Sequence, residues 1–209
     1  MGKRVLVIWG DPYHPEETYR EFVNAVFPAP QWRLCTTHSA RELLRGEAPE
    51  LAVCLSVGRA QGDTDLSPQE QAAVAALVDK GMGMLFLHAG LACIADETPL
   101  FDLALGRFAS HPAGEQRVAC RAIPGVAHPV LRGVDAFAAE DEAYFCKVDL
   151  ARAQPFLAAQ SAAGTEIAGW TQTYGAGRTC ALTPGHSPEM LQKMERLVKN
   201  AAAWCVKEC

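Results

Sequence analysis

The stretch MLFLHAGLA at residues 84–92 decides the fold that this sequence predicts. An apolar, strand-like run ends there in a segment of small residues, which is typical of the sharp strand-to-helix corner where many α/β enzymes carry a nucleophile. The residue at the tip is His88, which is not the usual nucleophile of such a corner. Gly90 lets a helix begin close behind the strand. The stretch predicts an α/β fold whose corner has either a different chemistry or none.

The chain before this corner alternates strand and helix signals, as parallel sheets do. Strands are expected at residues 4–9, 32–37, 50–58 and 83–88, and helices at 15–27, 39–46 and 67–81. The last helix has the clearest boundaries. Ser67 and Glu70 form a Ser-x-x-Glu capping box around Pro68, and Gly81 ends the helix.

After the corner, the pattern of alternating strands and helices gives way to a series of short strand-like segments. Residues 89–106 carry a helix that Pro99 must interrupt or restart. From about residue 114 the segments are short and strand-like, with a hairpin at 173–178 and a closing helix at 187–206. These strands are expected at 115–123, 142–148, 155–161, 166–174 and 177–185. With no repeat or linker, residues 1–209 are expected to form one domain.

Composition excludes several classes of protein. The net charge is -5 and no run of five Lys or Arg occurs, which disfavours nucleic acid and acidic membranes as partners. The first apolar run is too short for a signal peptide or a spanning helix. None of the eight cysteines forms a CxxC pair. Reduced thiols and a cytoplasmic location are therefore expected, and homo-oligomer formation is left open.

Two histidines are expected at one edge of the sheet. Ligands of open parallel sheets bind beyond the carboxyl ends of the strands. His88 follows the fourth strand, and His186 lies in the TPGHSPE loop before the closing helix. A helix N-terminus near each ring disfavours a positive charge, so a neutral imidazole is expected, able to accept a proton or bind a metal. The alternative for His88 is a histidine hydrogen-bonded into the core.

His14 is a third candidate, in the loop after the first strand. Glu16 and Glu17 lie close by, and together with the imidazole they offer the nitrogen and oxygen donors that a divalent metal accepts. The alternative is that the two carboxylates only complement the dipole of the helix that begins there.

Further candidates lie in the second half. His111 and His128 each precede a proline, which favours turns, and His111 is the stronger candidate. The segment AEDEAYF at 139–145 places Asp141, Glu142 and Tyr144 at the start of an expected strand. Because side chains alternate along a strand, Glu142 is expected to share a pocket with Tyr144, and Asp141 is not.

Several motifs together resemble the ThuA-like family, named for trehalose utilisation. They are LFLHAG, FASHP, HPVLRG, DEAY and YGAGRTCALTPGHSPE, followed by a closing helix with Trp204. This resemblance covers nearly the whole chain. It implies the fold of class I glutamine amidotransferases: a flavodoxin-like, doubly wound, mostly parallel sheet, here with short extra strands in the second half. His88 then stands where those enzymes have their cysteine, so glutaminase activity is not expected.

The resemblance also implies a role in carbohydrate metabolism, on a sugar or an oxidised (keto) sugar. His88, His186 and Glu142 are the implied catalytic residues of a hydrolase-, lyase- or isomerase-type reaction. His14, His111 and Tyr144 are the implied substrate-binding residues. A divalent metal such as zinc, on His14, His88 and His186, is left open. The alternative is a non-catalytic sugar-binding or regulatory protein with the same pocket; either way the expected partner is a small carbohydrate.

Overall fold

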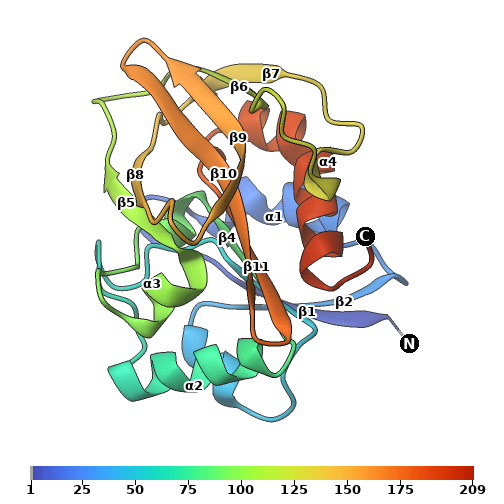
Figure 1. The fold of residues 1–209 in the computed structure, drawn as a ribbon. Helices are drawn as coiled ribbons and strands as arrows, with labels where there is room; N and C mark the ends of the chain where they lie inside the picture. Colours follow the sequence, from blue (N-terminus) through green and yellow to red (C-terminus); the bar gives the residue numbers. More distant parts are fainter. Residues whose placement is uncertain (1) are drawn as a thin grey trace.

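A large mixed sheet organises the computed structural model, which describes residues 2–209. Its nine strands run in the order β2-β1-β3-β4-β11-β10-β9-β6-β7, and β5 and β8 form a separate two-stranded sheet (Figure 1). The strands are β1 Lys3–Ile8, β2 Trp32–Thr37, β3 Leu51–Cys54, β4 Gly83–Leu87, β5 Gly106–Ser110, β6 Gln116–Ala122, β7 Phe137–Asp141, β8 Phe145–Val148, β9 Gln154–Ser161, β10 Gly164–Tyr174 and β11 Gly177–Leu182.

The sheet has two halves of different character. Strands β2, β1, β3, β4 and β11 pair in parallel, whereas β10, β9, β6 and β7 continue the sheet in antiparallel pairs. The expectation of an α/β fold is confirmed, and the strands predicted after residue 114 build the antiparallel half. This half makes the sheet mixed.

Helices cover both faces of the sheet. Helices α1 (Glu16–Val26) and α4 (Pro188–Cys205) pack on one face, and α2 (Pro68–Asp79) and α3 (Pro99–Ala104) on the other (Figure 1). Each side encloses its own apolar cluster, one around α4 and the other around α2. Three 3-10 turns complete the elements: η1 Ala40–Leu44, η2 His88–Leu91 and η3 Pro129–Leu131. No helix within residues 2–209 combines the length and the apolar character that crossing a membrane requires.

Most predicted elements are confirmed, including the capping box of α2, the restart at Pro99, the hairpin and the closing helix. Four predictions were wrong in detail. The strand expected at 50–58 ends at Cys54, the helix expected at 39–46 is only η1, and β8 begins at Phe145 rather than at residue 142. The helix expected directly after the corner is only η2, because the chain leaves helical geometry before Pro99.

Two strands had no clear sequence signal. The β7 sequence FAAED is rich in alanine and acidic residues, and the β5 sequence GRFAS begins with glycine. Such residues have low intrinsic strand propensity. Their extended geometry comes from pairing with β6 and β8, so it depends on contacts that are distant in sequence.

Candidate functional site

Four side chains converge at the carboxyl edge of the sheet. They are His14, His88, Glu142 and His186, and one ligand atom from each lies within 4.8 Å of the others. His14 follows β1, His88 follows β4, and His186 follows β11, which runs parallel to β4. Glu142 follows β7 of the antiparallel half. The site is therefore assembled where the two halves of the sheet meet.

His88 is fully buried on a strained corner. Its φ angle is 45°, in the left-handed region that side chains other than glycine rarely adopt. Behind it, a Cβ on Gly90 would overlap the backbone oxygen of Cys54, so only glycine lets η2 pack against β3. The His88 Nδ1 atom lies 2.8 Å from the carbonyl oxygen of Thr183. A carbonyl only accepts, so Nδ1 carries the hydrogen and the Nε2 lone pair faces the site.

His14 is oriented by a buried carboxylate. Asp11 Oδ1 accepts hydrogen bonds from His14 Nδ1 at 3.0 Å and from the backbone N–H groups of Tyr13 and His14 at 2.9 Å. Its Oδ2 atom accepts from the N–H of Val57 at 3.0 Å. Burial raises the pKa of Asp11, but these hydrogen bonds outweigh it and the net pKa is lowered. His14 thus presents the lone pair of Nε2 to the site, as His88 does.

The loop that carries His186 is held by Asp141. This fully buried carboxylate accepts three backbone N–H groups, those of Gly185, His186 and Ser187, at 2.9, 2.9 and 2.7 Å. Gly185 has a φ of 133°, in the region that favours glycine. Burial, with repulsion from the neighbouring imidazoles, lowers the pKa of His186 despite the attraction of Glu142. His186 is therefore neutral at pH 7.

Glu142 completes the cluster. Its Oε2 atom lies 3.3 Å from Nε2 of His88 and 3.4 Å from Nδ1 of His186, and its Oε1 atom lies 3.9 Å from Nε2 of His111. Burial raises the pKa of Glu142, but the neighbouring imidazoles, His88 first, outweigh burial when they are protonated and lower the pKa to about 2. Glu142 is therefore a carboxylate at neutral pH.

The cluster is rich in acceptors. His14 Nε2, His88 Nε2 and His186 Nδ1 are buried, and none has a hydrogen-bond partner within residues 2–209. Two of these nitrogens must be lone pairs, and they face a carboxylate. Buried acceptors that face one another are costly unless a cation satisfies them. The three ring nitrogens lie within 4.8 Å of one another, close enough for one ion to bind them together. These residues fit a divalent metal.

Comparisons with known proteins agree with this architecture. The family model ThuA, described as "Trehalose utilisation", matches residues 4–205. The chain belongs to the ThuA family. A search of curated proteins found no significant match.

Solved structures share the ThuA fold at low sequence identity. A ThuA-like protein from Parabacteroides merdae has a TM-score of 0.77 at 15% identity, over 100% of this chain and 91% of that one. One from Bacteroides uniformis has a TM-score of 0.75 at 16% identity, over 97% of this chain and 91% of that one. A β-galactosidase from Rahnella sp. R3 has a TM-score of 0.63 at 11% identity, over 95% of this chain and 31% of that one.

Two further predicted residues lie beside the ThuA-family cluster. The ring of Tyr144 stacks on that of His88, with centroids 4.0 Å apart, and the His111 ring lies 6.0 Å from Tyr144. Burial, and then the charge of Glu142, raise the pKa of the Tyr144 phenol well above its ordinary value. Tyr144 therefore stays protonated at neutral pH. The structure thus brings all six predicted site residues to one place, and their roles stay predictions.

The surroundings of the cluster differ in part from the expectations. Glu16 and Glu17 lie in the first turn of α1, which agrees with the alternative that they complement the helix dipole, and Glu16 pairs with Arg20 at 2.6 Å. Asp141 and Glu142 do not begin a strand, since β7 ends at Asp141. The helix N-terminus expected beside His88 is only that of the short 3-10 turn η2, and the His88 Nδ1 donates to the carbonyl oxygen of Thr183. His128 has a structural role: its Nδ1 accepts from the Val130 N–H and begins η3.

The sequence analysis missed Asp11 and gave Asp141 no role. Asp11 had a usable signal, because an aspartate three residues before His14 in DPYH is typical of a turn in which the carboxylate binds nearby N–H groups. Asp141 had no such signal. Its partners at 185–187 are far away in sequence and reach it only in the folded chain.

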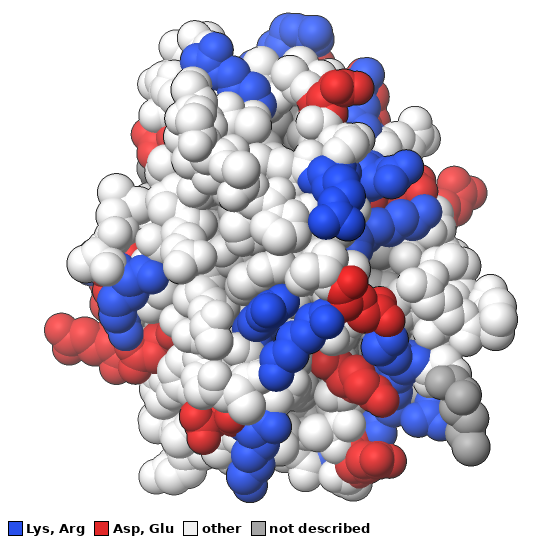
Figure 2. All heavy atoms as spheres, turned by 45° about the vertical axis from the view of Figure 1, so that its right-hand side comes forward, with Lys and Arg blue, Asp and Glu red and all other residues white. Residues whose placement is uncertain are grey.

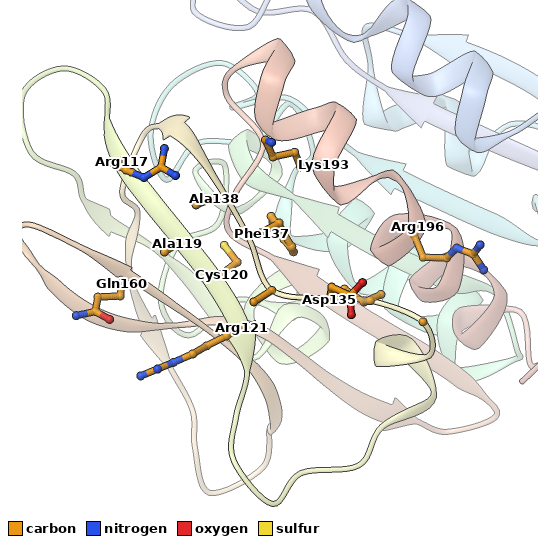
Figure 3. A pocket seen from close by; sticks show the side chains of 13 residues that line it. Arg117, Ala119, Cys120, Arg121, Asp135, Phe137, Ala138, Gln160, Lys193 and Arg196 are labelled. Atoms are coloured by element: carbon orange, nitrogen blue, oxygen red, sulfur yellow. The ribbon is translucent and has the colours of Figure 1, made fainter.

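A separate hollow of about 700 Å³ lies between β6, β7 and α4, away from the cluster. Arg117, Arg121, Lys193 and Arg196 line it, but the side chains of Arg121 and Arg196 extend in opposite directions (Figure 3). On the face drawn in Figure 2, basic side chains lie next to acidic ones. These charges converge on no common point, so this hollow is a weaker candidate than the histidine cluster.

Proposed function

We propose that this ThuA-family chain is a metal-dependent enzyme that acts on a sugar or an oxidised (keto) sugar. The observation that carries the proposal is the buried set of unpaired ring nitrogens facing Glu142. Imidazole ligands suit zinc and similar divalent ions. The family description supports a carbohydrate, as does the occurrence of this fold within a β-galactosidase.

Each residue has a distinct role in this proposal. His14, His88 and His186 hold the ion, and Asp11, Thr183 and Asp141 fix their orientation. Such outer partners typically control metal affinity as strongly as the ligands do. A divalent ion supplies a Lewis acid for a carbonyl or hydroxyl oxygen of the sugar.

Glu142 is the proposed proton acceptor. It is ionised, lies within 3.4 Å of ring nitrogens of His88 and His186, and is only partly buried, so a bound sugar can reach it. Tyr144, which keeps its proton, is the proposed donor to the substrate. An ionised carboxylate that accepts a proton and a phenol that donates one, acting on the same sugar, suit lyase or isomerase chemistry.

Glutaminase activity is not proposed, because the corner position holds His88 and no accessible thiol among residues 2–209 lies beside it. Cys93 is buried, and its Sγ lies 3.3 Å from the carbonyl oxygen of Gly90, to which it donates. The neighbouring Cys54 sulfur and burial raise the pKa of Cys93 well above the ordinary value of a thiol.

All eight cysteines are free, which supports the proposed cytoplasmic location. The finer fold proposal is that the parallel half is a flavodoxin-like, doubly wound unit.

The test combines metal analysis with turnover. Protein purified without added metal is assayed for bound ions, titrated with zinc, and incubated with a panel of keto-glycosides. His88→Ala should abolish both zinc binding and turnover, and Glu142→Gln should abolish turnover. His38→Ala is the matched control, because that ring is exposed and outside the cluster.

The outcomes separate the alternatives. A wild-type site that stays empty on titration refutes the metal proposal, and turnover that survives His88→Ala refutes the catalytic assignment. Sugar binding without product after long incubation favours the non-catalytic sugar-binding or regulatory protein.

A further inference from the structure

A pocket of about 380 Å³ opens from the histidine cluster towards solvent. Its lining includes His14 and Glu142 from the cluster, with Tyr13, Arg59, Phe108 and Tyr144 around them. Small-molecule sites typically have volumes of this order, with aromatic walls and a few polar groups. The pocket is therefore large enough for a ligand that extends beyond the cluster.

Tyr13 is the unusual residue of this pocket. Its side chain is 74% exposed, and only Leu150, at 60%, joins it among the large hydrophobic side chains that are exposed within residues 2–209. An exposed aromatic side chain gains nothing from the core, so its free face is available for a ligand. Leu150 lies outside the pocket and is an internal reference for an exposed apolar side chain without such a role.

The backbone beneath Tyr13 is firmly held. Its N–H donates to Asp11 Oδ1 at 2.9 Å, and Asp11 and His14 exchange backbone hydrogen bonds on either side at 3.3 and 3.2 Å. The same Asp11 carboxylate orients His14. One buried carboxylate thus holds both the backbone of Tyr13 at the pocket mouth and the ring of His14, a proposed metal ligand, at its base. A rigid mount lowers the entropy cost of binding.

The chemistry of the lining suits a sugar ring. A pyranose presents C–H groups on its faces and hydroxyl groups at its rim. The flat face of Tyr13 matches the former, and the polar side chains of Arg59 and Gln61 match the latter. Arg59 has no carboxylate within 4.0 Å among residues 2–209, and its guanidinium contacts only the backbone oxygen of Asp65. Its remaining N–H donors are free for ligand hydroxyls.

We propose that Tyr13 determines specificity by stacking on a second sugar ring while the first ring lies at the histidine cluster. The site then takes a disaccharide or other glycoside in preference to a free monosaccharide. This proposal rests on the proposed function, because the first ring is placed by the cluster.

The test is calorimetric binding of trehalose, maltose, cellobiose and glucose to the zinc-loaded full chain. Tyr13→Ala and Tyr13→Leu should weaken disaccharide binding by about three- to tenfold, the range that one aromatic contact supplies. Tyr13→Phe should stay within about twofold, because it keeps the aromatic face. Glucose binding should not change in any variant, and Leu150→Ala should bind like the wild type.

Disaccharide binding that is unchanged in Tyr13→Ala overturns the proposal. A wild-type chain that binds none of the disaccharides, or binds glucose equally well, also overturns it. Zinc binding is measured in the same samples. If the chain binds zinc but the Tyr13 substitutions leave disaccharide binding unchanged, only the proposed contact between Tyr13 and a second sugar ring is refuted. If the Tyr13 substitutions weaken disaccharide binding in a chain that binds no zinc, only the proposed metal site is refuted.

Discussion

Asp11→Asn tests whether the buried carboxylate sets the metal-binding form of His14. Asp11 is only 1% exposed, and its two oxygens accept four hydrogen bonds. In asparagine one oxygen becomes an NH2 group. If the asparagine oxygen takes the place of Oδ1, the NH2 group takes the place of Oδ2 and faces the N–H of Val57. If the side-chain amide is turned the other way, the NH2 group faces the three donors that Oδ1 accepts from in the wild type.

The magnitude follows from these contacts. One buried donor left unpaired costs about 1–3 kcal/mol of unfolding free energy. Loss of the charge also leaves the tautomer of His14 less strongly fixed. Loss of such an outer partner typically weakens metal binding by about 10- to 100-fold, or about 1.4 to 2.7 kcal/mol.

Two measurements check this prediction. Urea unfolding of the metal-free chain gives the stability change, and competition with a chelator gives the zinc affinity. Asp96→Asn is the control, because Asp96 pairs with Arg107 and Lys147 at the surface and lies outside the cluster. Wild-type zinc affinity in Asp11→Asn would refute the reasoning that Asp11 orients a metal ligand.

Three further predictions concern the supports of the site. Asp141→Asn should lower the unfolding free energy by about 2–3 kcal/mol and weaken zinc binding, because it removes a charged acceptor from the loop at 185–187; equal urea midpoints would contradict this. Gly90→Ala should cost about 3 kcal/mol or more, since its Cβ meets the Cys54 carbonyl oxygen, and a variant that melts like the wild type would exclude the close approach. Burial lowers the pKa of His128 from 6.5. The unfolded chain therefore binds the proton more readily, and stability should fall as pH drops from above 6.5 through the lowered pKa. His128→Asn should flatten this slope in urea unfolding, and an unchanged slope would refute the assignment.

The sequence by itself determined the local elements. The capping box of α2 and the restart at Pro99 each depend on residues a few positions apart. The relevant forces are hydrogen bonds between near neighbours and backbone sterics, which act in any context. For the same reason, strand ends and the antiparallel strand β7 were less well predicted, because their pairing partners are distant in sequence.

In the candidate site, too, some features follow from the local sequence and others only from the tertiary structure. The sequence indicated which histidines follow parallel strands, and the parallel topology then brought His14, His88 and His186 to one edge. Only the tertiary structure decided that Glu142 reaches them from the antiparallel half and that Asp141 holds the opposite loop. A ring nitrogen becomes a metal-binding lone pair only when a specific acceptor takes the hydrogen of the other nitrogen. Such acceptors are placed by packing and not by neighbours in the chain.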